Sequence, residues 1–354
     1  MKSDFQRFFR KAPEAEASAP GRVNLIGDHT DYAEGYCLPM PLAQRTRVAM
    51  ARAESFRAAS LDTGGAAPEI CGFDPGGAPR RDWTDYVAGP IAELRNRGIA
   101  VPPVEVLIRS DVPQGAGVSS SAALEIAVIR AALALTGERL DDVEIARAGQ
   151  AAENLYCGLQ CGILDQMASS VGRPGHALFL DCRTSEGGLF ALPRQFHFAV
   201  VHCGEARRLV DGAYNARRAA VEEAARLLGV LALRDADETM LPRLPGGEIR
   251  NRARHVVSDN TRVLAALDAL EVDDAASFGA LMTASHWSLA KDYDVSTEAL
   301  DRLVETALGA GAKGARLTGA GFGGCIVALV APEEAEGWWT RVAAAHPKAW
   351  AVSL

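Results

Sequence analysis

The loop at residues 113–121, Pro-Gln-Gly-Ala-Gly-Val-Ser-Ser-Ser, has the composition of an anion site. Gly115 and Gly117 allow the backbone to turn tightly and to approach a ligand closely. Ser119, Ser120 and Ser121 follow where a helix is expected to begin, and the first N–H groups of a helix have no partners within it. Backbone donors, hydroxyls and the positive end of the helix dipole together predict a phosphate-binding loop.

The segments around this loop are expected to position it. The apolar run at 104–109 predicts a strand, and residues 122–133 predict a helix that stops at Gly137. The loop fits neither common phosphate motif, because Val118 stands where a P-loop has Lys and Ser120 where a dinucleotide fingerprint has its third Gly. Taken alone, it also fits a glycine turn followed by a serine-capped core helix.

A second polar cluster lies in the turn Asp28-His-Thr-Asp31, after the apolar pair Leu25-Ile26 and Gly27. Sugar hydroxyls both donate and accept hydrogen bonds, so carboxylates and an imidazole in one turn suit a polyhydroxylated ligand. The alternative is an Asx-turn in which the side chains bond only their own backbone.

Four further features carry either chemistry or structure. Glu153, on a predicted helix over 141–156, is a surface charge or a ligand. Asp165, at a predicted helix start, is a partner for the helix dipole or a catalytic group. Trp83 is a core anchor or a stacking face for a base. The glycine-rich loop at 317–324, before an apolar strand, is a tight turn or a close approach to a ligand.

Composition limits the classes of function. The 354 residues exceed what one hydrophobic core usually serves, so we expect two domains. A net charge of −8 argues against nucleic acid as the main partner. The first eleven residues lack a secretory h-region but predict a short docking helix with Phe5, Phe8 and Phe9, and no apolar run reaches membrane-spanning length. Seven scattered cysteines favour reduced thiols and a cytoplasmic location.

Three separated motifs resemble the galactokinase, homoserine kinase, mevalonate kinase and phosphomevalonate kinase superfamily. They lie at residues 21–32, 113–123 and 317–324, and the first resembles the signature of galactokinases themselves. Shorter segments that also resemble galactokinases lie at 161–166, 213–218, 254–257 and 285–289. The resemblance therefore covers residues 18 to 330, which is most of the chain.

The resemblance implies a fold of the α/β class, with two two-layer α+β domains and the active site in the interdomain cleft. We expect an N-terminal kinase domain at 1–174, carrying the sugar motif, the phosphate loop and Asp165, and a C-terminal kinase domain at 175–354. The N-terminal half is expected to contain the left-handed β-α-β crossover of the superfamily, against the usual right-handed rule. Strands are expected at 177–182 and 196–203, and helices from 213, over 252–271 and over 296–309.

The resemblance also implies an activity, which is ATP- and Mg²⁺-dependent phosphorylation of galactose at its C1 hydroxyl to galactose 1-phosphate, a step of the Leloir pathway. Asp165 would be the base and Arg22 would orient it and offset the phosphoryl charge. The sugar contacts implied are Asp28, His29, Asp31, Gly162 and Tyr214. The ATP contacts implied are Trp83, Gly115, Gly117, Ser119, Ser120 and Ser121. The metal ligands implied are Ser121 and Glu153.

One position departs from the pattern. Galactokinases usually have Glu where this chain has Asp28, and that residue is implied to contact the C6 hydroxyl of the sugar. The shorter side chain puts the range of sugars in question. The alternatives are a superfamily kinase acting on another or a C6-altered sugar, and a non-catalytic sensor of galactose and ATP. For the kinase we expect a monomer whose partners are the small molecules galactose and ATP, and neither nucleic acid nor membrane, whereas a sensor would pass its signal to a partner.

Overall fold

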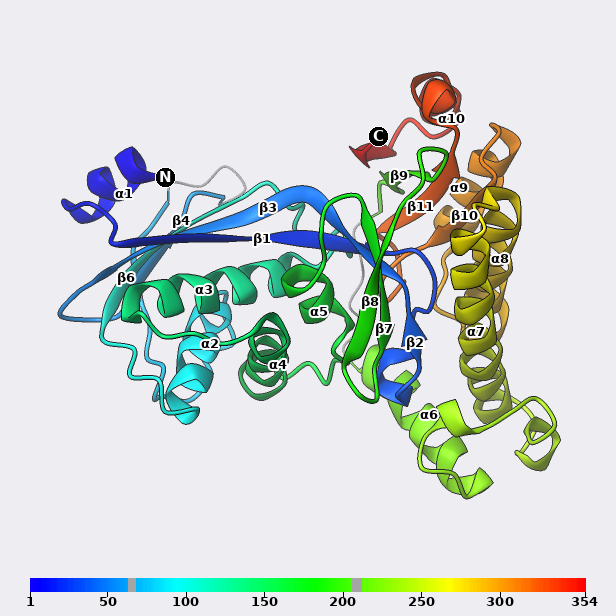
Figure 1. Cartoon of the computed structure of the whole chain (residues 1–354), viewed down its shortest axis with the longest axis horizontal. Helices are drawn as coiled ribbons and strands as arrows, with labels where there is room; N and C mark the ends of the chain where they lie inside the picture. Colours follow the sequence, from blue (N-terminus) through cyan, green and yellow to red (C-terminus); the bar gives the residue numbers. More distant parts are fainter. Residues whose placement is uncertain (63–67, 206–211) are drawn as a thin grey trace. The chain divides into compact units, whose positions relative to one another are not determined.

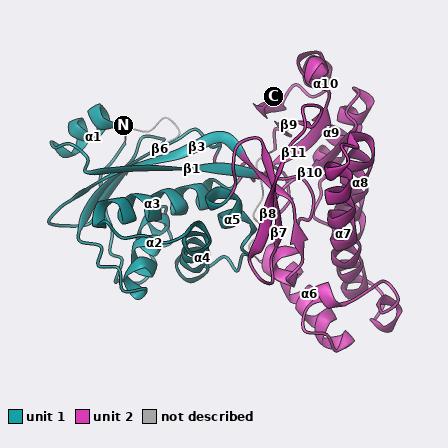
Figure 2. Cartoon of the chain, viewed as in Figure 1, with its two compact units in different colours: residues 1–22, 42–113, 119–171 teal, residues 23–41, 114–118, 172–354 magenta. Residues whose placement is uncertain are grey.

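The computed structural model describes residues 1–62, 68–205 and 212–354, and the chain folds into two compact units (Figure 2). Unit 1 contains residues 1–22, 42–113 and 119–171, and unit 2 contains residues 23–41, 114–118 and 172–354. The units differ from the two contiguous domains expected. Residues 23–41, which contain the predicted sugar turn Asp28–Asp31, and residues 114–118 of the phosphate loop pack with the C-terminal half. As a division of function, the domains 1–174 and 175–354 stay a prediction.

Unit 1 is built on a five-stranded sheet in the order β1-β3-β6-β4-β5. Its strands are β1 (Ala15–Asn24), β3 (Pro39–Arg52), β6 (Val104–Ser110), β4 (Arg57–Ser60) and β5 (Cys71–Gly72). The expected strand at 104–109 is confirmed as β6. It pairs antiparallel with β3 and parallel with β4. The chain between β4 and β6 passes through β5 and a helix, so this parallel pair is where the predicted left-handed crossover belongs, and its hand stays a prediction.

Helices cover one face of this sheet, as Figure 1 shows. They are α2 (Asp85–Asn96), α3 (Ser120–Thr136), α4 (Asp142–Ala152) and α5 (Leu164–Ser170). Val48 and Met50 of β3 and Val106 of β6 share a buried cluster with Ile126 and Ile129 of α3. The helix expected at 122–133 is therefore confirmed as α3. It ends where predicted, because Gly137 adopts the left-handed conformation with φ +77°.

The other face of the sheet carries the N-terminal helix α1 (Lys2–Phe9). Phe5 and Phe9 are buried against Ala49 of β3 and Leu107 of β6, which point away from α3 because side chains alternate along a strand. The expected docking helix is confirmed. Its driving force is the burial of two aromatic rings.

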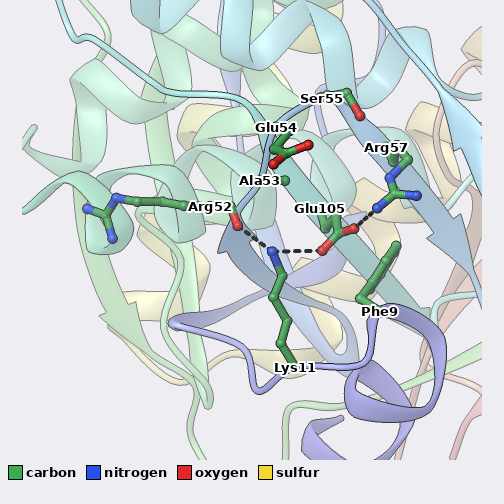
Figure 3. Close-up of a pocket in the computed structure, with 8 residues that line it drawn as sticks. All are labelled: Phe9, Lys11, Arg52, Ala53, Glu54, Ser55, Arg57 and Glu105. Atoms are coloured by element: carbon green, nitrogen blue, oxygen red, sulfur yellow. Dashed lines mark hydrogen bonds and ion pairs between the residues drawn. The ribbon is translucent and has the colours of Figure 1, made fainter.

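A cavity of about 650 Å³ lies beside the end of α1 (Figure 3). The carboxylate of Glu105, which is buried, lies 2.9 Å from Lys11 Nζ and also pairs with Arg57. Lys11 donates to the backbone carbonyl of Arg52, while the Arg52 guanidinium binds Glu14. Because these charges satisfy one another, we interpret the cluster as an ionic clamp on the N-terminal segment rather than as a ligand site.

Unit 2 contains two antiparallel sheets. The first has the order β10-β11-β9-β12 and the second the order β2-β7-β8. The strands are β10 (Gly314–Leu317), β11 (Cys325–Val330), β9 (His197–His202), β12 (Trp350–Ser353), β2 (Tyr36–Cys37), β7 (His176–Asp181) and β8 (Glu186–Ala191). The strands expected at 177–182 and 196–203 are confirmed as β7 and β9. Strand β8 was not predicted. None of its residues is buried, so its sequence lacks a clear apolar pattern.

Helices pack around the first of these sheets (Figure 1). They are α6 (Ala213–Leu228), α7 (Glu248–Glu271), α8 (Ala275–Ser288), α9 (Glu298–Gly309) and α10 (Ala335–Ala345). The three helices expected in this half are confirmed as α6, α7 and α9, whereas α8 and α10 were not predicted. Within the described ranges, each helix is too short or too polar to cross a membrane.

Helix α8 packs directly on strand β10 through two glycines. A Cβ on Gly279 of α8 would lie 2.3 Å from the carbonyl oxygen of Lys313, and a Cβ on Gly314 of β10 would lie 2.1 Å from the carbonyl oxygen of Gly279. Such distances are not found between real atoms, so the contact requires glycine on both sides. It fixes β10, the strand that leads into the third motif.

We therefore expect Gly279→Ala to destabilise the protein by about 1–3 kcal/mol, because the added methyl group forces α8 away from β10. Chemical denaturation monitored by circular dichroism measures this. Gly309→Ala in α9 is the control, since a Cβ there meets nothing within 4 Å and alanine is the better helix former. Equal stability of the two variants would contradict the close packing.

Candidate active site

The carboxylate of Asp165 accepts hydrogen bonds on both of its oxygens. Helix α5 presents it from its first turn, and Arg22 lies at the part of β1 that belongs to unit 1. Arg22 Nε donates to Asp165 Oδ1 at 2.8 Å and its Nη2 donates to the same oxygen. The Ser119 hydroxyl donates to Oδ2 at 2.6 Å. About 29% of the Asp165 side chain is exposed while Arg22 is buried. The carboxylate is therefore partly open to solvent, and the guanidinium that orients it is not.

Ser119 takes a different role from the one its position predicts. It is the N-cap residue of α3, but its hydroxyl binds Asp165 and no side chain caps the helix. Its backbone is left-handed, with φ +58°, which is uncommon for a residue with a Cβ. The alternative interpretation, in which a serine caps the core helix, is therefore not what Ser119 provides. Strain of this kind persists where surrounding bonds enforce it, which is typical of functional sites.

Glu153 and Ser121 lie together, as the predicted metal site requires. Glu153 begins a π-helical turn, Glu153–Cys157, which follows α4, and the Ser121 hydroxyl hydrogen-bonds its carboxylate. Burial raises the pKa of Glu153, and the negative charge of Asp165 raises it further. A hydroxyl and a carboxylate are hard oxygen ligands that fit Mg²⁺. The described residues contain no cluster of three or more His, Cys, Asp or Glu at metal-binding spacing, so phosphate oxygens and water would have to complete a magnesium shell.

Glu153 is hydrogen-bonded to the amide of Gln166, which also binds a second buried carboxylate, that of Glu125. Gln166 Nε2 donates to Glu153 Oε2 at 2.6 Å and to Glu125 Oε2 at 3.2 Å. All three side chains are buried. Burial raises the pKa of Glu125 well above its usual range, and the charge of Glu153 raises it further. Gln166 thus fixes the orientation of Glu153 by linking it to α3.

The other predicted residues of unit 1 lie at recognisable places. Gly162 is buried in the turn before α5, three residues before Asp165. Ser120 is the first residue of α3 and is half-buried. Trp83 is half-buried and packs against the core shared by the sheet and helices, which supports the core-anchor alternative for part of its surface.

In unit 2, Ala116 and Gly117 of the phosphate loop contact the third motif backbone to backbone. A Cβ on Gly319 would lie 2.8 Å from the carbonyl oxygen of Gly117, and one on Gly324 would lie 2.9 Å from that of Ala116. Gly115 and Gly117 have φ +70° and +79°. The glycine-rich third motif is therefore explained by the close approach of the phosphate loop, as well as by its own turn.

The predicted sugar turn has an unusual backbone that is held from several sides. Gly27 has φ +89° and His29 has φ +63°. The Thr30 hydroxyl lies 2.9 Å from the carbonyl oxygen of Gly27 and 2.8 Å from that of Tyr36, so it bridges the two ends of the turn. Asp31 begins a short 3₁₀ helix, Asp31–Ala33. The turn is thus more than an Asx-turn, because later parts of unit 2 determine its shape.

The imidazole of His29 belongs to a buried chain of hydrogen bonds. His29 Nε2 lies 3.2 Å from the carbonyl oxygen of Ala320, which can only accept, so Nε2 carries the proton. In the neutral ring, Nδ1 then accepts from the Tyr32 hydroxyl at 2.8 Å, and that oxygen accepts from the Tyr293 hydroxyl. Burial raises the pKa of both tyrosines. The Tyr214 ring lies 5.7 Å from the His29 ring, so this predicted sugar residue joins the cluster.

Asp28 is buried, unlike a residue that simply projects from a turn. Its Oδ2 accepts from Arg316 Nη2 at 2.7 Å, and its backbone carbonyl lies 3.0 Å from His255 Nε2. Asp28, His29, Asp31 and Tyr214 are therefore brought together within unit 2. Their contact with sugar stays a prediction.

Comparisons with known proteins agree with these motifs. Residues 3–52 match the galactokinase galactose-binding signature, residues 85–173 the N-terminal domain of GHMP kinases, and residues 266–346 the C-terminal region of GHMP kinases. The structure of galactokinase from Lactococcus lactis, solved in complex with galactose, is 30% identical, with a TM-score of 0.93 over 100% of this chain and 97% of that one. The chain belongs to the galactokinase family.

More distant kinases share the fold of this galactokinase-family chain. Mevalonate kinase from Methanococcus jannaschii is 20% identical, with a TM-score of 0.67 over 94% of this chain and 95% of that one. Phosphomevalonate kinase from Streptococcus pneumoniae, solved with phosphomevalonate and AMPPNP, is 15% identical, with a TM-score of 0.67 over 95% and 98%. The expected two-domain α+β kinase fold is therefore confirmed.

Sequence reasoning missed several residues that shape the site. Glu125 is the acidic residue in an otherwise apolar helix segment, and this contrast with its neighbours was the available signal. Gln166 follows Asp165 directly, but nothing in the sequence indicates that its amide bridges two carboxylates. Tyr293 and Arg316 lie more than 260 residues from the turn that they contact, so their partners were visible only in the fold.

The hydroxyl of Ser119 is expected to contribute to turnover by orienting Asp165. Ser119→Ala should lower kcat about ten- to a hundredfold, the effect of losing one hydrogen bond to a charged group, with a smaller change in KM for the sugar. Steady-state kinetics measures both constants. Ser119→Gly is the control, because it removes the hydroxyl but relieves the strained φ. Normal kcat in the glycine variant would mean that strain, not the hydroxyl, explained the loss.

Glu125 is expected to cost stability at neutral and alkaline pH. Its pKa is raised on folding, so the unfolded chain loses this proton first and the free energy of unfolding falls as pH rises above the unfolded pKa of about 4.3. Glu125→Gln should therefore stabilise the protein at pH 8, with the gain shrinking toward pH 4. Urea denaturation across this range measures it. Glu138→Gln, at an exposed position after α3, should show no such trend, and a Glu125→Gln variant less stable at pH 8 would refute the argument.

Proposed function

We propose that this chain phosphorylates galactose at the C1 hydroxyl, using ATP and Mg²⁺, and yields galactose 1-phosphate and ADP for galactose metabolism by the Leloir pathway. The observation that carries the proposal is the Asp165 carboxylate, which Arg22 and Ser119 hold in one orientation within a chain that belongs to the galactokinase family. The galactokinase from Lactococcus lactis was solved with galactose bound, which supports the choice of sugar.

Asp165 would accept the proton of the C1 hydroxyl as that oxygen bonds to the γ-phosphorus and the bond between the phosphorus and the oxygen bridging to the β-phosphate breaks. The leaving group is ADP, and the proton on Asp165 then passes to solvent. Arg22 would hold the carboxylate through Oδ1 and offset charge on the transferring group, while Ser119 holds Oδ2. Phosphoryl transfer depends mainly on such positioning and charge stabilisation.

Glu153 and Ser121 would bind Mg²⁺, with Gln166 holding Glu153 in place. When bound, the metal supplies positive charge that neutralises the phosphate oxygens. The backbone of Gly115 and Gly117 and the start of α3, with Ser119, Ser120 and Ser121, would hold the phosphates. Trp83 would contribute the exposed part of its ring to adenine.

Asp28, His29, Asp31 and Tyr214 of unit 2, and Gly162 of unit 1, would bind the sugar. Both ring nitrogens of His29 already have partners in the protein, so a sugar hydroxyl at the ring would have to replace the carbonyl of Ala320 or the hydroxyl of Tyr32. We also propose that residues 1–174 and 175–354 serve as the two kinase domains, and that the chain acts as a monomer on small molecules in the cytoplasm. All seven cysteines occur as thiols, which supports a reducing compartment.

The short side chain at position 28 favours one alternative, a kinase that prefers a sugar altered at C6. The sensor alternative has less support, because the residues of the phosphate loop, Glu153, Asp165 and Arg22 are all present. An ADP-release assay with magnesium-ATP should compare galactose with 2-deoxygalactose, glucose, galacturonate, N-acetylgalactosamine and mevalonate. We expect galactose to lead, whereas sugar binding without ADP release would favour the sensor.

The base role is tested by Asp165→Asn, which keeps the size of the side chain but cannot take up the proton. We expect kcat to fall about a hundredfold to ten-thousandfold, the usual contribution of general base catalysis, with KM for galactose within a few fold. Steady-state kinetics with saturating magnesium-ATP measures this. Near-normal turnover in the variant would leave Asp165 a positioning role only.

A further inference from the structure

Arg316 is a buried cation inside the core of unit 2. It lies in β10 between Ala315 and Leu317, and none of its surface is exposed. Its Nη2 donates to Asp28 Oδ2 at 2.7 Å, while its Nε and Nη1 have no hydrogen-bond partner within the described ranges of the chain. A buried guanidinium with unpartnered donors lowers stability relative to an apolar residue of similar size. Stability alone therefore does not account for arginine at this position.

The residues around the pair show what the arginine does. Burial lowers the pKa of the His255 ring, which disfavours its charged form. The carbonyl oxygen of Asp28 can only accept, so His255 Nε2 donates to it at 3.0 Å, and Nδ1 lies 2.9 Å from the Ser288 hydroxyl. The backbone of Asp28 is thus fixed from α7 and its carboxylate is fixed from β10.

A second ion pair, between Asp259 and Arg262, lies near the pair of Asp28 with Arg316. Asp259 is buried, accepts from Arg262 Nη1 at 3.0 Å and from the Ser285 hydroxyl at 2.9 Å, and interacts electrostatically with both His255 and Arg316. Asp259 thus has its own hydrogen-bonded cation, and Asp28 is the carboxylate to which Arg316 is hydrogen-bonded. The effect of Arg316 is directed at the turn between Gly27 and Asp31.

We infer that Arg316 is a specificity-determining positioning residue that holds the Asp28 carboxylate in the orientation that reads the exocyclic C6 group of the sugar. Because Arg316 is fully buried, it acts through Asp28 and does not touch the sugar. Asp28 is one methylene shorter than glutamate, so its carboxylate lies close to the backbone and takes its direction from the guanidinium behind it. The inference rests on the proposed function, in which Asp28 belongs to the sugar site.

The test compares galactose with 6-deoxygalactose, which lacks only the C6 hydroxyl. In the parent enzyme we expect a clear preference for galactose in kcat/KM. Arg316→Met should lower kcat/KM for galactose ten- to a hundredfold through KM, with kcat within threefold, and should change 6-deoxygalactose less than threefold. Arg316→Lys keeps the charge and should restore part of the preference.

Arg316→Met leaves Asp28 as a buried charge without its cation and therefore endangers folding. The double variant Asp28→Asn with Arg316→Met removes both charges and is expected to fold. Because Arg316 acts through Asp28, this double variant and Asp28→Asn alone should show the same galactose preference. Arg262→Met is the matched control, since it removes a guanidinium from the neighbouring ion pair and should lower stability without changing the preference.

The outcomes separate the two levels of the proposal. A parent enzyme that phosphorylates neither sugar would refute the proposed function itself. A parent that phosphorylates both equally, Arg316 variants that weaken both sugars equally, or additive effects of the Asp28 and Arg316 substitutions would overturn the inference while leaving the kinase activity intact. The inference is supported if Arg316→Met loses the preference for galactose over 6-deoxygalactose, and if the effects of the Asp28 and Arg316 substitutions on that preference are not additive.

Discussion

The arrangement of unit 1 depends on holding one carboxylate, that of Asp165, in a fixed direction near solvent. Its donors come from places far apart in the chain, because Arg22 precedes it by 143 residues and Ser119 by 46. The sheet brings β1 beside β3, and α3 and α5 pack on one face of that sheet. The fold of unit 1 is therefore what brings three polar residues, far apart in the chain, into one hydrogen-bonded group.

Holding acidic groups in this way conflicts with stability. Glu125, Glu153 and Asp165 bring three carboxylates together, and burial combined with mutual repulsion raises the pKa of the first two. The cationic Arg22, which pairs with Asp165, offsets part of this repulsion. Such a cost at an active site is the usual trade between stability and activity. The hydrogen bond from the amide of Gln166 keeps the Glu153 carboxylate in one direction despite this repulsion.

Sequence reasoning recovered what local pattern and composition determine. The strand at 104–109, the helix ending at Gly137 and the docking helix with Phe5 all follow from short-range rules, and the structure confirms them. It failed where the partner is distant. The alternative of a serine cap does not hold at Ser119 because its hydroxyl binds Asp165, and no local rule predicts that 23–41 and 114–118 pack with residues after 172. The resemblance to a family, not the residue pattern, supplied the roles of the carboxylates.

The two units fix their functional groups by different physical means. In unit 1 the decisive contact is ionic, between Arg22 and Asp165, and its strength depends on charge and on how far water penetrates. In unit 2 the turn at Gly27–Asp31 is shaped by the backbone of Gly27 and by neutral hydrogen bonds from Thr30, Tyr32 and His255, to which the buried ion pair of Arg316 with Asp28 adds. Neutral bonds hold a geometry over a wide range of pH and salt. The turn is thus held mainly by contacts that pH and salt affect little, whereas the Asp165 carboxylate is held mainly by an ion pair.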